Sequence, residues 1–263
     1  MKISVFDWVI LSLLFILGVV FFFFFYRSAA YIDIRVKVTD QDILYEYSRP
    51  SSQYTDHFVV GDVELDSLGK VISEITNIER FPVDNNRNIL YIDLKVKATY
   101  DSRTKLYQSR GQKIVYGAPI RFSLSKVTFD GYIIDFPGRE TSSEVLSKNI
   151  TFVVRSRLIE KEVAQSISSG NKVTTSSGET ILVIDTVGLT AAELVTEDSQ
   201  GYPHLRYHPY LKDVLVTITA NVTKIGNTYY LYDDIPLVIG NYQTFVVENK
   251  IIRDAYILSM EEN

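Results

Sequence analysis

The sequence predicts a mainly β protein, in which one N-terminal transmembrane helix precedes two tandem small domains of the β-barrel or β-sandwich type. Three observations predict this fold class: an apolar run near the N-terminus, stretches in which apolar and polar residues alternate, and a duplication of the alternating region. The predicted parts are a short head at residues 1–7, the helix at 8–26, a first β domain at 31–136, a linker at 137–147 and a second β domain at 148–263.

The apolar run from Trp8 to Tyr26 contains no charged residue. A helix of this length spans roughly 28 Å, which matches the thickness of the hydrocarbon core of a bilayer. A secretory signal peptide cleaved at Ser28-Ala29-Ala30 is the alternative, but the apolar part of such a peptide is usually about 7 to 15 residues long. The run therefore predicts an uncleaved, single-pass membrane anchor.

The orientation of this anchor is a second prediction. Basic residues lie on both sides of the run, so the positive-inside rule does not choose between the two orientations. A very short head and a long tail are typical of a signal anchor. We therefore expect a protein of the cytoplasmic membrane whose C-terminal domains lie outside the cytoplasm, and a cytoplasmic tail is the alternative.

The duplication consists of glycines and branched apolar residues that recur at fixed offsets. Gly61 and Gly69 precede one such series, and Gly170 and Gly178 precede its match. The two series are Ile72, Ile75 and Ile78, and Ile181, Ile184 and Val187. Further matches pair Ala98, Tyr107, Gly117 and Phe122 with Ala220, Tyr229, Gly240 and Phe245. A period of about 110 residues is the size of a domain rather than of a solenoid repeat, so we expect two copies of one domain.

Alternation with a period of two runs through both copies. Residues 32–38, 90–98 and 214–222 place apolar side chains at every second position, as half-buried strands do. The isoleucine series could also lie on a helix, but its second copy is rich in β-branched residues, which favours strands. The remaining expectations are a short helix at Ile159–Ile167, one or two helical turns around Thr190–Leu194 and a long loop at Leu194–Leu211.

Composition excludes several classes of function. The formal net charge is −5, which makes nucleic acid an unexpected partner. The chain has no cysteine, which excludes disulfides, thiolate metal sites and cysteine catalysis. It also lacks a Gly-x-Ser-x-Gly motif, a phosphate-binding loop and a dinucleotide fingerprint. The sequence therefore predicts a protein that is not an enzyme and needs no cofactor.

Two histidines near the predicted long loop are candidate metal ligands. His204 and His208 are four residues apart, a zinc-binding spacing on a helix. Pro203 and Pro209 bracket them, which disfavours a helix there. The alternatives are a disordered loop and an aromatic loop that packs on the domain or on a partner, and the aromatic loop is favoured. Its candidate partner-binding residues are Tyr202, Tyr207 and Tyr210.

Three acidic residues are a second metal candidate. Asp62, Glu64 and Asp66 would share one side of an extended strand, as calcium ligands could in an exported protein. The second copy has no matching acidic set. A solvated strand edge that discourages the addition of further strands is the favoured alternative, so no metal is predicted.

The glycine pattern carries a resemblance to a known family. A Gly-Asp turn at Gly61, the run from Gly69 to Ile75, an alternating strand and the Gly-x-x-Ile-x-Phe element at Gly117 resemble the bacterial envelope family named domain of unknown function 4330. Members of that family begin with a single anchor and have no assigned chemistry. The resemblance implies a cell-envelope location and no particular activity.

A fainter resemblance is to the mammalian cell entry domain of lipid-transport proteins. The run from Gly69 to Ile75 and the strand at 89–98 are similar to strands of that small β-barrel. The resemblance implies a lipid or hydrophobic-ligand conduit. The segment 105–116 departs from that family, because it contains three basic residues where the family has a hydrophobic pore loop.

The predicted function is binding or assembly by a membrane-anchored envelope protein through its duplicated β domains. The expected partners are the bilayer and other envelope proteins or further copies of the chain. A component of a lipid or hydrophobic-ligand conduit is the alternative function.

Overall fold

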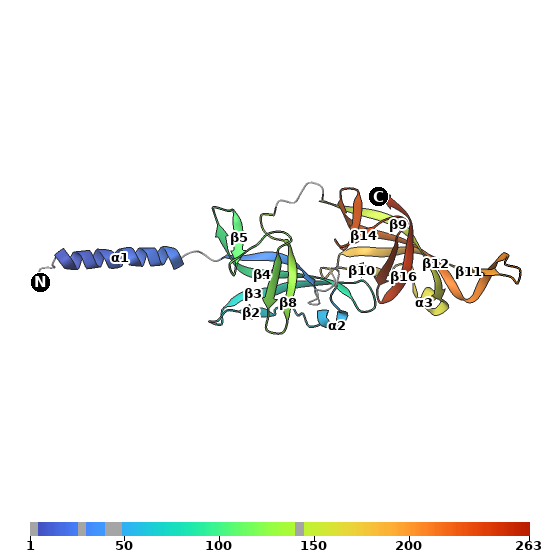
Figure 1. Cartoon of the computed structure of the whole chain (residues 1–263), viewed down its shortest axis with the longest axis horizontal. Helices are drawn as coiled ribbons and strands as arrows, with labels where there is room; N and C mark the ends of the chain where they lie inside the picture. The colour runs from blue at the N-terminus through green and yellow to red at the C-terminus, as the bar shows by residue number, and fades with distance from the viewer. Residues whose placement is uncertain (1–4, 26–29, 40–48, 140–144) are drawn as a thin grey trace.

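The structure is a computed structural model that describes residues 5–25, 30–39, 49–139 and 145–263. It confirms a mainly β fold, in which a helix and two curled sheets follow one another along the long axis of the molecule (Figure 1). The predicted head at 1–7, the alternative cleavage position at Ser28-Ala29-Ala30 and the predicted linker at 137–147 lie partly outside the described residues.

Helix α1 (Val5–Phe25) projects from one end of the molecule (Figure 1). Its large apolar side chains are exposed where they are described, and Trp8 and Phe15 expose 63% and 74% of their surface. Within the part of the chain that the structure describes, no helix has both the length and the apolar character needed to cross a bilayer. The transmembrane helix at 8–26 therefore stays a prediction.

Each sheet contains eight strands. The first sheet has β1 (Ala30–Thr39), β2 (Val63–Leu65), β3 (Val71–Pro82), β4 (Asn88–Asp101), β5 (Leu106–Ser109), β6 (Gln112–Lys113), β7 (Pro119–Ser123) and β8 (Thr128–Asp135), with a short helix α2 (Ser52–Thr55). The second has β9 (Val145–Glu160), β10 (Lys172–Thr174), β11 (Thr180–Glu197), β12 (Pro203–Ile225), β13 (Thr228–Leu231), β14 (Ile235–Leu237), β15 (Tyr242–Val247) and β16 (Lys250–Glu262), with a short helix α3 (Lys161–Ser166).

The two sheets have the same topology. The strand order is β2-β3-β4-β1-β8-β7 in the first sheet and β10-β11-β12-β9-β16-β15 in the second. A side ribbon leaves each sheet at the same place, because β5 and β6 extend β4 as β13 and β14 extend β12. Every strand of the first sheet therefore has a counterpart, as the duplicated sequence pattern predicts.

The matched glycines make matched turns. The N–H of Gly61 donates to the carbonyl of Ile75 at 2.8 Å, and the N–H of Gly170 donates to that of Ile184 at 2.8 Å. Their φ angles are 85° and 89°, a left-handed conformation that only glycine adopts without strain. These glycines recur because both copies need the same backbone geometry at the entry to the sheet.

Two apolar cores fill the insides of the curled sheets. The alternating residues are buried as predicted, with Ile34 and Val36 in the first domain and Val216 and Ile218 in the second exposing 2% or less. The core of the second domain also contains four residues from one hairpin of the first domain. These residues are Phe81, Val83, Ile89 and Tyr91.

Local expectations have mixed outcomes. A helix appears inside the range predicted at Ile159–Ile167, where α3 runs from Lys161 to Ser166. The helical turns predicted around Thr190–Leu194 and the loop predicted at Leu194–Leu211 are wrong, because this segment forms the ends of β11 and β12. Up to residue 210, β12 pairs with β11 only, so the prolines there lie on a strand with a free edge, where a missing N–H is tolerated.

Candidate functional site

A two-stranded arm is the most prominent feature of the second domain. We define the arm as residues 193–210, where β11 and β12 extend past the remaining strands to the end of the molecule opposite α1 (Figure 1). Between the matched positions Ile75/Ile184 and Ala98/Ala220 the repeat offset grows from 109 to 122, so the arm hairpin is 13 residues longer than its counterpart β3–β4.

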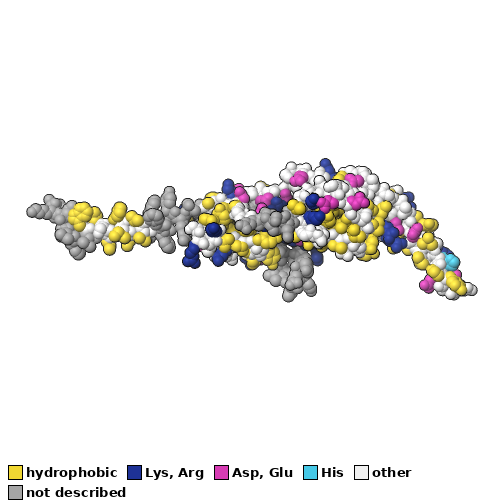
Figure 2. All heavy atoms as spheres, turned by 90° about the horizontal axis from the view of Figure 1, so that it is seen from above, with side chains coloured by type: hydrophobic (Ala, Val, Ile, Leu, Met, Phe, Trp, Pro, Cys, Tyr) yellow, Lys and Arg dark blue, Asp and Glu magenta, His cyan; other side chains and the backbone are white. Residues whose placement is uncertain are grey.

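One face of the arm presents an apolar stripe. Val195 and Leu205 are cross-strand partners, and Tyr207 lies two residues further along the same face of β12. These side chains expose 71%, 58% and 64% of their surface. Figure 2 shows hydrophobic side chains along this projection. Glu193, the cross-strand partner of Tyr207, and Glu197 lie on the same face.

The predicted partner-binding tyrosines all lie on this hairpin. Tyr202, Tyr207 and Tyr210 are 63%, 64% and 74% exposed, so none of them packs on the sheet. Tyr202 follows the turn at the tip and Tyr210 lies near the base. The structure adds Val195 and Leu205, which the sequence reading missed because it placed this segment in a loop, where facing pairs cannot be assigned.

The tip of the arm is held by one carboxylate. Asp198 accepts hydrogen bonds from the backbone N–H groups of Gln200 at 2.8 Å and Tyr202 at 3.0 Å, and its second oxygen lies 3.0 Å from Nε2 of His204. The His204 contact is the largest influence that lowers the pKa of Asp198 below its usual value. The arm therefore has a defined turn rather than a free tip.

The two histidines are not brought together. His208 uses Nδ1 to accept the backbone N–H of Leu211 at 3.0 Å, whereas His204 contacts Asp198. On an extended strand, residues four apart lie roughly 13 Å from each other. Among the described residues no group of three or more potential ligands could hold a metal ion.

The first two acidic candidates are buried and already bonded. Asp62 accepts hydrogen bonds from the hydroxyl of Ser125 and from the backbone N–H of Lys126 at 3.2 Å, which ties β2 to the turn after β7. Glu64 forms an ion pair with Arg110. Asp62 and Glu64 are only 5% and 8% exposed, so the favoured alternative of a solvated strand edge is wrong for them.

The third acidic candidate caps a turn. Asp66 accepts hydrogen bonds from the backbone N–H groups of Leu68 at 2.8 Å and Lys70 at 2.9 Å. The Lys70 bond is the largest influence and holds the pKa of Asp66 below its usual value. Thr175 makes the same bond to the N–H of Glu179 in the second copy, at 3.0 Å, so this carboxylate has a structural counterpart.

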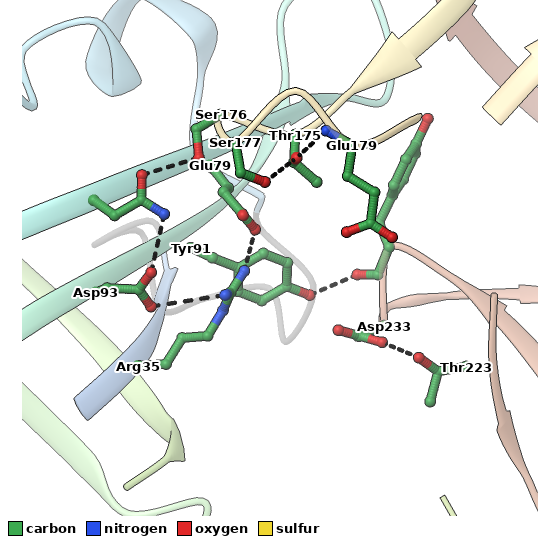
Figure 3. Close-up of polar contacts among 12 residues, drawn as sticks. Arg35, Glu79, Tyr91, Asp93, Thr175, Ser176, Ser177, Glu179, Thr223 and Asp233 are labelled. Atoms are coloured by element: carbon green, nitrogen blue, oxygen red, sulfur yellow. Dashed lines mark hydrogen bonds and ion pairs between the residues drawn. The ribbon is translucent and has the colours of Figure 1, made fainter. Parts of the chain in front are cut away.

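A second contact region joins the two domains. The ring of Phe81 stacks on Tyr232 with 4.6 Å between centroids and 5° between planes. The hydroxyl of Tyr91 donates to the carbonyl of Tyr232 at 2.7 Å. Phe81 comes from β3 and Tyr91, labelled in Figure 3, comes from β4. The end of this hairpin therefore packs into a recess of the second domain.

The recess depends on an unusual backbone. Tyr232 and Asp233 have φ angles of 55° and 57°, which residues other than glycine rarely adopt. This conformation costs energy and persists where surrounding contacts favour it. Burial is the largest influence that raises the pKa of Tyr91 above its usual value, followed by Asp233 and Asp234. Tyr91 therefore stays protonated and donates its hydrogen bond.

Charges complete this contact. Lys37 of β1 and Arg49 both pair with Asp234, the latter at 3.0 Å. The hydroxyl of Ser176 donates to Oδ1 of Asn77 at 2.9 Å. The cations come from the first domain and the carboxylate from the second, so the two domains carry opposite charges at this contact.

A small cavity of about 180 Å³ remains beside Tyr91. Arg35 lines it, but Glu79 pairs with this guanidinium and Asp93 lies 3.7 Å from it. Figure 3 shows these groups pointing toward one another. Its lining residues include no histidine, lysine or cysteine. The region is built to hold the domains together.

Comparisons with known protein families, with curated proteins and with solved structures give no match for this chain. The resemblances to the envelope family and to the mammalian cell entry domain therefore stay predictions. The fold and the site define a class on their own: two tandem β domains of identical topology, docked to each other, with an aromatic arm at one end.

Proposed function

We propose that the protein is a non-enzymatic, membrane-anchored envelope protein that works in assembly, and that its arm is the surface that binds a protein partner. The observation that carries this proposal is the exposed stripe of Val195, Leu205 and Tyr207 on a two-stranded hairpin. An apolar, aromatic stripe that projects into solvent is costly unless a partner covers it.

The helix supports the anchoring part of the proposal. The described side chains of α1 are exposed and apolar along one continuous stretch, residues 10–20. Such a helix is stable when lipid surrounds it. The anchor would hold the chain at the bilayer, and the arm, at the end of the molecule opposite α1, would reach away from the bilayer toward a partner (Figure 1).

The lipid-conduit alternative has less support. A conduit needs an apolar bore, whereas large side chains fill the inside of each sheet. Phe122 and Phe129 stack at 5.2 Å in the first domain, and Phe152 and Phe245 lie 5.5 Å apart in the second. We therefore favour assembly over transport.

Site-specific photo-crosslinking tests the binding role. A photoreactive phenylalanine analogue at Tyr207 should give covalent adducts with a protein in intact cells. The matched control is the same analogue at Tyr242, which is 68% exposed on β15 of the same domain. Adducts at Tyr207 and none at Tyr242 would support the arm as the binding surface. Equal or absent labelling at the two positions would remove the proposal.

Protease treatment of spheroplasts tests the orientation. If the domains lie outside the cytoplasm, added protease should degrade the tail and leave a membrane-protected fragment about the size of α1. A fully protected chain that becomes sensitive only after lysis would contradict export. Release of the whole chain by alkaline extraction would contradict the anchor.

A further inference from the structure

The recess that Phe81 fills has a counterpart on the first domain. We call the filled one the second-domain socket and its counterpart the first-domain socket. The second-domain socket is lined by Thr175, Ile181, Asn221, Tyr230, Tyr232 and Asp233. The residues at the matching repeat positions are Asp66, Ile72, Thr99, Gln108, Arg110 and Gly111, and all six line one cavity of the first domain.

The backbone of the two sockets also matches. Tyr232 and Asp233 have φ angles of 55° and 57°, and their counterparts Arg110 and Gly111 have 51° and 78°. Each pair lies in the tight turn that connects the two strands of the side ribbon, so the recurrence shows that the same turn borders both sockets. The first domain therefore carries a socket of the same design.

The first-domain socket is open. Its cavity measures about 360 Å³, against about 180 Å³ for the space left in the filled socket. Leu68, whose N–H donates to Asp66 of the lining, is 80% exposed. Tyr100 is 55% exposed, whereas its counterpart Val222, which lines the filled socket, is only 2% exposed. A position that is buried beside the docked hairpin in the second domain is thus exposed in the first.

The element that would fill this socket is known from the other domain. The end of the β3–β4 hairpin fills the second-domain socket, and the arm is the extended end of the corresponding β11–β12 hairpin. Among the described residues, the first-domain socket therefore has no hairpin in it, and the arm occupies no socket. They lie at opposite ends of the molecule, near α1 and far from it, so they can meet only between two copies (Figure 1).

The charges of the unused pair are complementary. Lys97 lines the first-domain socket, and Lys70, whose N–H donates to Asp66 of the lining, occupies the repeat position of Glu179 in the filled socket. The arm carries Glu193 and Glu197 beside its apolar stripe. Beside the filled socket, Lys37 of β1 and Arg49, both from the first domain, instead meet the carboxylate of Asp234. Opposite polarity would steer the arm to the first-domain socket and away from the acidic second one.

We infer that the arm of one copy docks into the first-domain socket of a second copy, so that the protein assembles head to tail. This inference rests on the proposed function, because it names the partner of the arm. A contact between two different surfaces of identical subunits generates a ring if the rotation closes and a filament if it does not.

Charge reversal tests the inference with the full-length chain in a non-ionic detergent. The arm variant is Glu193→Lys with Glu197→Lys, and the socket variant is Lys70→Glu with Lys97→Glu. Light scattering and sedimentation should show concentration-dependent oligomers of the unaltered protein. Each variant alone should associate at least about tenfold more weakly, because like charges then face each other. An equimolar mixture of the two variants should restore association, since each reversed surface regains an opposite partner.

The mixture also guards against misfolding, because a variant that fails to fold cannot be rescued by its partner. A protein that remains monomeric, or oligomers that neither variant weakens, would overturn the inference. Oligomers weakened by both variants but not restored by mixing would also overturn it. If the socket variant instead reduces binding to vesicles of anionic phospholipid while oligomers persist, the socket faces lipid and the inference fails.

This experiment separates the inference from the function on which it rests. If crosslinks at Tyr207 contain a different protein, the arm binds a partner but the proposed partner is wrong. If Tyr207 gives no crosslinks at all, both the function and the inference fail.

Discussion

The two sockets differ in whether a hairpin fills them: the second-domain socket is filled and the first-domain socket is open. In the second domain the socket buries Phe81 and Tyr91 of the neighbouring domain, and its carboxylate is neutralised by two cations. In the first domain no hairpin of the described residues fills the matching recess, and the nearby residues Leu68 and Tyr100 stay exposed. The same recess therefore holds the two domains together in one place and is uncovered in the other, where we propose that a second copy docks.

The comparison extends to how each sheet is closed. In the first domain Asp62 of the β2 side accepts the N–H of Lys126 after β7. In the second domain Glu248 after β15 accepts the N–H of Lys172 on β10, at 3.1 Å. The carboxylate thus lies beside β2 in the first domain and after β15 in the second, but in both domains it closes the same gap between the corresponding strands. The contact is kept although the acidic position differs, so the acidic residue at Asp62 has a structural role and does not mark a metal site.

The largest expected effect concerns the filled socket. Replacing Phe81 by alanine should lower the free energy of unfolding by about 3–5 kcal/mol, because a stacked, buried ring is lost and a cavity remains. The matched control Leu205→Ala on the arm should change it by less than about 0.5 kcal/mol. Urea denaturation at low protein concentration measures both values. Equal losses in the two variants would mean that the two hairpins do not differ as described.

A smaller effect is expected from the charges. Asp234→Asn removes the partner of Lys37 and Arg49 and should cost about 1–2 kcal/mol at low salt, because the three groups are only partly screened by water. The loss should shrink at high salt. Glu193→Gln on the arm serves as the control and should leave the stability of the monomer unchanged. A salt-independent loss for Asp234→Asn would argue against an electrostatic cause.

The smallest effect is a pH dependence confined to the second domain. Glu262 accepts hydrogen bonds from Lys148, Lys224 and Tyr229, and these donors, Lys148 first, lower its pKa from 4.5 to about 2. Folding therefore favours the ionised carboxylate, and the stability it adds is fully present above pH 4.5 and is lost as the pH falls to about 2.

Glu262→Gln should therefore be slightly less stable than the unaltered protein at neutral pH and equal to it near pH 2. Tyr107, the counterpart of Tyr229, packs on the ring of Tyr100 at 5.2 Å instead. Acid titration followed by tyrosine fluorescence measures the difference. A gap between variant and unaltered protein that stays constant down to pH 2 would contradict the assignment.

Much of the sheet architecture could be predicted, because its signals are local. Alternation identified strands such as residues 90–98, and the glycine at Gly61 identified a turn that its copy at Gly170 repeats. The arm was misread as a loop, because its prolines suppress a strand signal unless the strand is known to have a free edge. Its three tyrosines are exposed, and their role in binding a partner stays a prediction.

The docking of the two domains could not be predicted from local pattern. Phe81 looks like an ordinary strand residue, and nothing in the sequence near it names Tyr232 as its partner. Only the structure assigns Asp234 to a pair with cations almost two hundred residues earlier in the chain. The burial of Asp62 and Glu64 likewise depends on groups from distant strands.

The central claim is that the arm of one copy enters the first-domain socket of another. The natural chain has no cysteine, so single cysteines can report this contact directly. Full-length chains carrying Leu205→Cys and Leu68→Cys should, when mixed and oxidised, form a disulfide-linked dimer that contains one of each. Each chain alone should give little dimer, and Tyr242→Cys should not replace Leu68→Cys. A mixture that yields no more of the mixed dimer than the Tyr242→Cys control would contradict the account.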